Sequence, residues 1–154
     1  MFSIKNFFAT FLFCLIFFCN FTASAEIFDE EKHGWELLNN LRTEYGISAV
    51  TWNHNSNLQK AAEIRAQEIS QKFSHDRPDG SSCFTAIKQA GVVRYMTCGE
   101  NIAMGTNLGA ERAMELWKNS EGHFKNMINK DFSEVGIAAY RVGENIYWVQ
   151  LFAG

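Results

Sequence analysis

The sequence of 154 residues has no run of basic residues, no internal repeat and no low-complexity tract. It carries 14 Lys and Arg against 17 Asp and Glu, which gives a formal net charge of −3. A nucleic acid or an anionic membrane bound through bulk charge needs a basic surface, so this mild acidity argues against both partners. The motif Gly-x-Ser-x-Gly is also absent. A serine or cysteine hydrolase therefore has little support from the sequence.

Long apolar runs are confined to the N-terminus, where residues 7–21 are almost entirely Phe, Leu, Ile and Cys. Lys5 precedes this run, and Ala23-Ser24-Ala25 follows it with the small-x-small pattern of a cleavage site. The pattern predicts a secretory signal peptide over residues 1–25 and a mature chain that starts at Glu26. The alternative is a retained membrane anchor, for which the run is short against a bilayer core of ~30 Å.

Removal of residues 1–25 leaves 154 − 25 = 129 residues, which suits one domain at residues 26–154. Lys5 leaves with the signal, so the mature charge is 13 − 17 = −4. We expect a secreted or periplasmic, monomeric, single-domain protein with no transmembrane segment in the mature chain and no nucleic-acid partner.

Cysteine is scarce, and Cys14 and Cys19 would leave with the signal. The remaining pair, Cys83 and Cys98, is an even count in an exported chain and predicts a disulfide. Closing a loop of about 15 residues would stabilise the fold by ~3 kcal/mol in the chain-entropy model. The alternative is two reduced thiols.

The hydrophobic pattern predicts helices first and a β-hairpin last, which indicates the α+β class. Residues 92–104 are expected to be irregular, and Gly122 is expected to break the last helix just before His123. Helices are expected at residues 29–45, from Asn55 or Ser56 to 71, at 82–90 and at 108–120, and hairpin strands at 134–140 and 145–152.

His75, Glu100 and His123 are the candidate site residues, because each stands just outside a predicted regular element. If the fold brings them together, two imidazoles could bind a divalent ion such as Zn²⁺ or Cu²⁺, and Glu100 could orient a water or accept a proton. Two protein ligands alone make a weak, exchangeable site. The alternative is that the three side chains only tie loops together. His33 and His54 are expected at the surface.

Several landmarks in a fixed order resemble the CAP superfamily, also called SCP-like, which includes cysteine-rich secretory proteins, antigen 5 and pathogenesis-related proteins. The resemblance spans about residues 37–152 and looks like the bacterial branch. Its landmarks are Val50-Thr51-Trp52-Asn53, Phe73-Ser74-His75, Gly99-Glu100-Asn101-Ile102, Trp117, Gly122-His123-Phe124, Val135-Gly136 and Tyr147-Trp148-Val149-Gln150.

The resemblance implies an α-β-α sandwich with a small antiparallel sheet between helical layers, and it would add a strand near residues 50–53 or 99–104. It also implies a cleft with two histidines and two acids. His75 and His123 match the histidines and Glu100 matches one acid, but Ser120 stands at the position of the second. Members of the family are described as exported and as binding divalent metals, sterols or other lipids, or partner proteins.

The sequence therefore predicts a secreted ligand-binding protein with a shallow cleft at His75, Glu100, Ser120 and His123. His75 and His123 would be the ligands of a weakly bound Zn²⁺ or other divalent metal. One alternative is a metal-assisted hydrolase with Glu100 as the general base. Another is a protein- or lipid-interaction module in which the cleft is purely structural.

Overall fold

The computed structural model describes residues 25–154 of the chain. The predicted signal peptide, except for its last residue, lies outside these residues. Within residues 25–154, no helix is both long and apolar enough to cross a membrane.

A three-stranded antiparallel sheet forms the middle of the fold, with the strand order β1-β3-β2. Strands β2 (Glu134–Val142) and β3 (Asn145–Ala153) form the predicted hairpin, in which Gly143 has a φ of 61°. That left-handed conformation suits glycine, which has no Cβ, and explains why the turn falls there. The hairpin prediction is confirmed.

Strand β1 (Cys98–Thr106) corrects the expectation of irregular structure for residues 98–104 and confirms the strand near 99–104 that the resemblance implied. It pairs with β3 along its whole length, from Cys98 opposite Ala153 to Thr106 opposite Asn145. Five successive residues at its centre are buried, since helices cover both faces of the sheet there. A strand buried on both faces has no alternation of apolar and polar residues, so the two-residue period was missing from the sequence.

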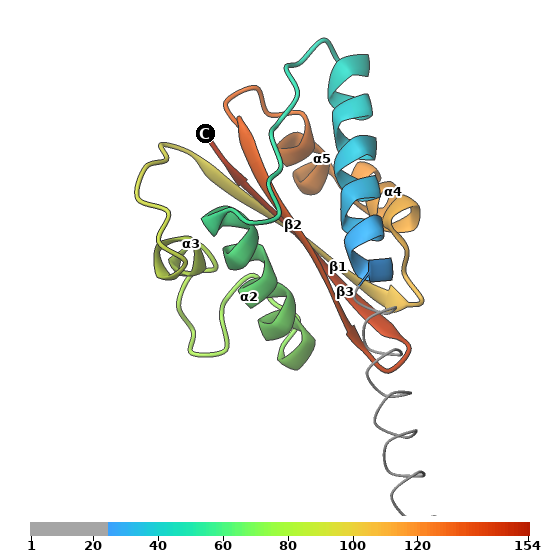
Figure 1. The fold of residues 1–154 in the computed structure, drawn as a ribbon, viewed down its shortest axis with the longest axis vertical. Helices are drawn as coiled ribbons and strands as arrows, with labels where there is room; N and C mark the ends of the chain where they lie inside the picture. The colour runs from blue at the N-terminus through green and yellow to red at the C-terminus, as the bar shows by residue number, and fades with distance from the viewer. Residues whose placement is uncertain (1–24) are drawn as a thin grey trace, which may run out of the picture.

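One face of the sheet is covered by α2 (Asn57–Gln71) and the short α3 (Thr85–Gln89), as Figure 1 shows. Ser56 is the N-cap of α2, and its hydroxyl accepts a hydrogen bond from the Gln59 N–H at 3.0 Å. Gly136 of β2 lets this helix approach closely, because a Cβ at that position would collide with the Leu58 carbonyl. The helix predicted at residues 82–90 corresponds to α3 and is confirmed only for its five residues, 85–89.

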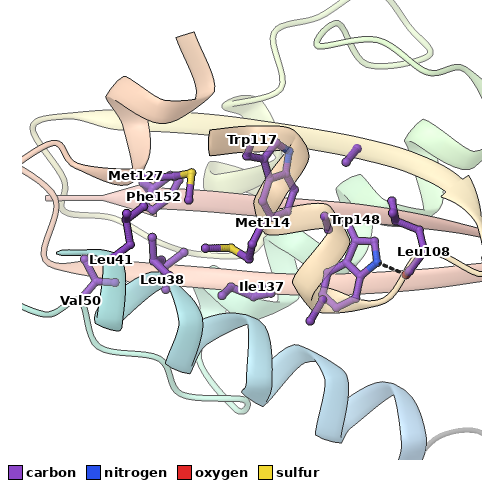
Figure 2. Close-up of a cluster of buried hydrophobic side chains, with 14 of the residues drawn as sticks. Leu38, Leu41, Val50, Leu108, Met114, Trp117, Met127, Ile137, Trp148 and Phe152 are labelled. Carbon is purple, nitrogen blue, oxygen red and sulfur yellow. Dashed lines mark hydrogen bonds between the residues drawn. The ribbon is translucent and has the colours of Figure 1, made fainter. Parts of the chain in front are cut away.

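The opposite face carries the N-terminal helix (residues 25–44), α4 (Ala110–Lys118) and α5 (Glu121–Met127). Figure 2 shows the larger core on this side, where Trp117 and Trp148 pack among leucine, methionine and isoleucine side chains. The Trp148 indole N–H donates to the Leu108 carbonyl at 2.7 Å. Helices on both faces of one sheet make the α-β-α sandwich that the resemblance implied.

The free edge of β2 is covered by groups from three other segments. The Val135 N–H donates to the Thr51 carbonyl, and the Thr51 N–H donates to the Ser133 carbonyl. The Gln59 side-chain amide donates to the Ile137 carbonyl and accepts from the Ile137 N–H. Glu31 of the N-terminal helix accepts the Ala139 N–H at 3.0 Å. These contacts satisfy strand groups that would otherwise attract another strand.

Candidate functional site

The fold brings His75 and His123 together although they are far apart in the sequence. Their ring centroids lie 6.2 Å apart. His75 lies in the loop between α2 and α3, whereas His123 lies in the first turn of α5. The expectation that Gly122 ends a helix is wrong, because Gly122 is the second residue of α5. Ser120, at the N-cap position, separates α4 from α5 instead.

Glu100 of β1 lies beneath His75 and is almost completely buried. Its carboxylate accepts a hydrogen bond from Arg65 Nε at 2.7 Å and lies 2.8 Å from His75 Nδ1. Arg65 comes from α2 and is fully buried. A buried carboxylate needs a counter-charge, and the guanidinium provides it together with two hydrogen bonds.

Arg65 is a site residue that was not identified from the sequence. It sits at a position of α2 whose neighbours one turn away are the buried residues Ala61, Ala62 and Ile69. A charged residue in such an apolar stripe is rarely buried without a partner, and that was the available signal. The sequence could not show that the partner was Glu100, which is 35 residues away.

The loop that carries His75 is held by a second ion pair. Arg77 bonds both oxygens of Glu68 and also donates to Thr85 Oγ1 at 3.1 Å and to Gln89 Oε1 at 2.7 Å. Glu68 in turn bonds Arg65 at 2.7 Å. The loop is therefore tied to α2 and α3, so the position of His75 is set by the same network that holds Glu100.

A buried amide network holds α5, and with it His123, against the sheet. Asn101 of β1 donates to the His123 carbonyl and to Gln150 Oε1, both at 3.1 Å. Asn126 of α5 donates to Asn101 Oδ1 at 2.9 Å and to the Glu100 carbonyl at 3.3 Å. Three of these bonds tie α5 to the β1 residues Glu100 and Asn101, so the strand that carries Glu100 also positions His123.

The two histidines have opposite electrostatic surroundings. The hydrogen bond to Glu100 raises the pKa of His75 above its ordinary value. Burial, followed by the nearby His75, lowers the pKa of His123. With the carboxylate on Nδ1, His75 has its Nε2 free for another partner, and 56% of its side chain is exposed.

Ser120 makes no side-chain capping bond to α5. Its neighbour Glu121 does not replace the missing acid, because its carboxylate pairs with Lys125 at 2.6 Å on an exposed surface. Within residues 25–154, no group of three or more His, Cys, Asp or Glu side chains is arranged to hold a metal ion.

Two hollows lie elsewhere in the described chain. One of about 530 Å³ lies between the N-terminal helix and α4, with Leu37, Leu41 and Met114 among its lining residues. Another of about 250 Å³ lies beside the β2–β3 hairpin and includes Glu26 and Arg141. Neither is lined by His75 or His123, so the shallow cleft stays a prediction.

The predicted disulfide is not formed in the structure, where Cys83 and Cys98 are free thiols. Burial, followed by the charge of Glu100, raises the pKa of Cys83 to about 12. Burial also raises the pKa of Cys98. An even cysteine count does not determine how the two side chains are placed, and in the fold Cys83 is buried while Cys98 is half-buried.

We expect the chain from Glu26 to contain two titratable thiols without prior reduction. Cys98 should react before Cys83, because Cys83 is buried and Cys98 is half-buried. Labelling in native buffer and in denaturant, followed by mass spectrometry, measures both. Cys98→Ser is the control that assigns the faster thiol. Failure to label any thiol in denaturant would establish a disulfide instead.

A model of the cysteine-rich secretory protein family, CAP, matches residues 35–152. The chain belongs to the CAP family. It is 33% identical over 135 residues to the uncharacterized protein YkwD of Bacillus subtilis, covering 86% of this chain and 50% of that protein. The chain thus spans about half the length of this curated relative.

Two solved structures share the CAP fold. An extracellular protein containing an SCP domain from Bacillus anthracis has a TM-score of 0.72 at 24% identity, over 81% of this chain and 40% of that one. An outer surface protein from Borrelia burgdorferi also has a TM-score of 0.72, at 20% identity, over 81% of this chain and 92% of that one. At these identities the likeness establishes the fold alone.

Proposed function

We propose that this chain is an exported CAP protein that binds a ligand through a divalent cation held weakly by His75 and His123. The observation that carries the proposal is the 6.2 Å separation of the two rings, combined with the contact of His75 Nδ1 to Glu100. Tetrahedral zinc with bonds of ~2.1 Å to a nitrogen of each ring holds the ring centroids roughly 5 Å apart, so the two rings would approach each other by about 1 Å on binding. Export rests on the N-terminal apolar run and its small-residue cleavage pattern.

Each residue has a separate role in this proposal. His75 and His123 bind the cation, and Glu100 orients His75 and favours the tautomer with a free Nε2. Arg65 holds the Glu100 carboxylate in place from inside the fold. A divalent cation would supply a Lewis acid with coordination positions left over for an oxygen or nitrogen group of the ligand. Ser120 in place of a second acid agrees with weak, exchangeable binding.

A metal-assisted hydrolase is less well supported by the same contacts. A general base needs a carboxylate that can accept a proton from water. Both oxygens of Glu100 already accept hydrogen bonds from Arg65, and one also faces His75. We therefore assign Glu100 to positioning His75.

The test is a calorimetric titration of the exported chain with Zn²⁺, after its N-terminus has been located by mass spectrometry. We expect saturable binding in the wild type and at least a roughly tenfold weaker affinity in His75→Ala/His123→Ala. Affinity should fall as pH is lowered through the pKa of His75, because a proton and the cation compete for the imidazole.

His33→Ala/His54→Ala is the matched control, because it also removes two histidines, both exposed on other parts of the surface. This variant should bind Zn²⁺ like the wild type. Equal binding by all three proteins, or none by the wild type, would reject the cation site and favour a protein- or lipid-interaction module with structural histidines.

A further inference from the structure

Strand β1 has a free edge whose backbone groups can be assigned from the pairing with β3. Successive residues of an antiparallel strand direct their N–H and C=O groups alternately toward the partner strand and away from it. Thr97 and Gly154, at one end of the pair, exchange two backbone hydrogen bonds of 3.0 and 3.1 Å. The residues of β1 that direct their backbone groups away from β3 are therefore Cys98, Glu100, Ile102, Met104 and Thr106.

The two outer strands of the sheet differ in how these edge groups are used. On β2, the outward N–H groups of Val135, Ile137 and Ala139 are bonded to other segments. On β1, the Glu100 carbonyl accepts a bond from Asn126 Nδ2 at 3.3 Å. Among residues 25–154, the outward backbone groups of Ile102, Met104 and Thr106 form no hydrogen bond. Met104 is 41% exposed and Thr106 is exposed as well. We call this stretch, from Ile102 to Thr106, the open edge.

We propose that the ligand of the histidine site is an extended peptide, which adds a strand along the open edge and binds the cation through its end. The inference rests on the proposed function for the cation and takes the class of ligand from the edge. A row of alternating backbone donors and acceptors is matched by another extended backbone. Each outward residue of the open edge offers one N–H and one C=O group to such a strand.

The open edge runs directly into the histidine site. Glu100 lies two residues before Ile102, which is ~7 Å along a strand. The Glu100 carboxylate contacts His75, and its carbonyl is occupied by Asn126 of α5, the helix that carries His123. An added strand therefore stops pairing at Glu100, in front of the two histidines. Antiparallel pairing, the more stable arrangement, would place the carboxyl end of the peptide there. A carboxylate oxygen is a normal zinc ligand.

The length of the open edge favours a short peptide over a second copy of the chain. From Ile102 to Thr106 the edge spans roughly 14 Å. A stable protein–protein interface buries about 800 Å² on each partner, which is far more than one short strand covers. A peptide on the same edge gains the bond to the cation as a second anchor, and two linked contacts bind more tightly than either alone.

The test selects binders for the exported chain, in the presence of Zn²⁺, from a synthetic library of random octapeptides with free carboxyl ends. We expect the selected peptides to bind Met104→Pro at least roughly tenfold more weakly than the wild type, because proline removes an edge donor and obstructs the added strand. The fold should tolerate this proline, since the Met104 N–H points away from β3. Met104→Ala keeps the N–H and should bind the peptides like the wild type.

A second measurement reports the geometry of the bound peptide. Methylating one peptide N–H at a time should weaken binding most at every second residue, since alternate N–H groups of an added strand face β1. Side-chain recognition without strand pairing produces no such alternation. A methylation profile without a period of two would therefore overturn the inference.

Arg141→Pro is the matched control, because Arg141 lies at an outward position of β2, on the other edge of the sheet. It should bind the peptides like the wild type, and circular dichroism should show all variants folded. Equal loss of peptide binding in Met104→Pro and Arg141→Pro would overturn the inference. Dimerisation of the peptide-free chain that Met104→Pro abolishes would assign the open edge to a second copy instead.

Calorimetry with Zn²⁺ alone separates this inference from the proposed function. Met104→Pro should bind Zn²⁺ like the wild type, because the substitution leaves both histidines in place. Zn²⁺ binding by the wild type without any selected peptide would overturn the peptide ligand and leave the cation site standing. Peptide binding that is unchanged in His75→Ala/His123→Ala would overturn the link between the open edge and the cation.

Discussion

Replacing Arg65 with Met should lower the free energy of unfolding by about 3–5 kcal/mol, the usual cost of removing one partner from a buried ion pair. Arg65 is fully buried, and its Nε lies 2.7 Å from Glu100 Oε2. Without the guanidinium, the buried Glu100 carboxylate retains His75 as its ion-pair partner, and the His75 side chain is more than half exposed. Urea denaturation of the wild type and the variant measures the difference.

The surface pair Arg112–Glu115 provides the control, because both side chains are more than half exposed. Arg112→Met should change stability by at most about 1 kcal/mol. The double variant Arg65→Met/Glu100→Leu should lose less than the sum of its two single variants, since it leaves neither charge buried alone. An Arg65→Met loss no larger than that of Arg112→Met would show that the buried pair does not hold the site.

Replacing Glu31 with Gln should stabilise the protein at pH 8 by up to about 3 kcal/mol. Burial raises the pKa of Glu31 to about 7, against the lowering effect of its bond to Ala139, and the nearby Glu63 raises it further. The folded state thus binds the proton more tightly than the unfolded state. The proton that Glu31 binds in the folded state therefore stabilises the fold fully below pH 4.5. This contribution is lost as the pH rises to about 7.

Glutamine keeps the acceptor for the Ala139 N–H and removes the charge, so the stability difference between the two proteins should grow between pH 4.5 and 7. Urea denaturation at a series of pH values measures it. Glu36→Gln, which changes an exposed carboxylate on the same helix, should give no such slope. A pH-independent difference for Glu31→Gln would mean that Glu31 is charged in the fold throughout this range.

Local chemistry explains the parts of the fold that the sequence predicted well. Ser56 caps α2 through its own hydroxyl, and Gly143 adopts the left-handed conformation that the hairpin turn needs. Both effects act within a few residues and leave a visible pattern. The ordered CAP landmarks did more, since they pointed to the layered fold and to the pair His75 and His123 before any contact was known.

The errors have different causes. The hydrophobic period missed strand β1 because both of its faces are covered, although the resemblance had implied a strand near residues 99–104. The expected helix break at Gly122 was a local misreading, because a glycine can also lie inside the first turn of a helix such as α5. The disulfide between Cys83 and Cys98 was predicted from an even count, which carries no information on how the two side chains are placed in the fold.

By itself, the sequence determined the family, the α+β class, the hairpin and the identity of the two histidines, because these follow from local propensities and from motifs in a fixed order. Only the tertiary structure decided that Arg65 neutralises Glu100 and that Asn101 holds the His123 carbonyl. Contacts between residues 20 or more positions apart depend on how helices pack on a sheet, and no local pattern encodes that.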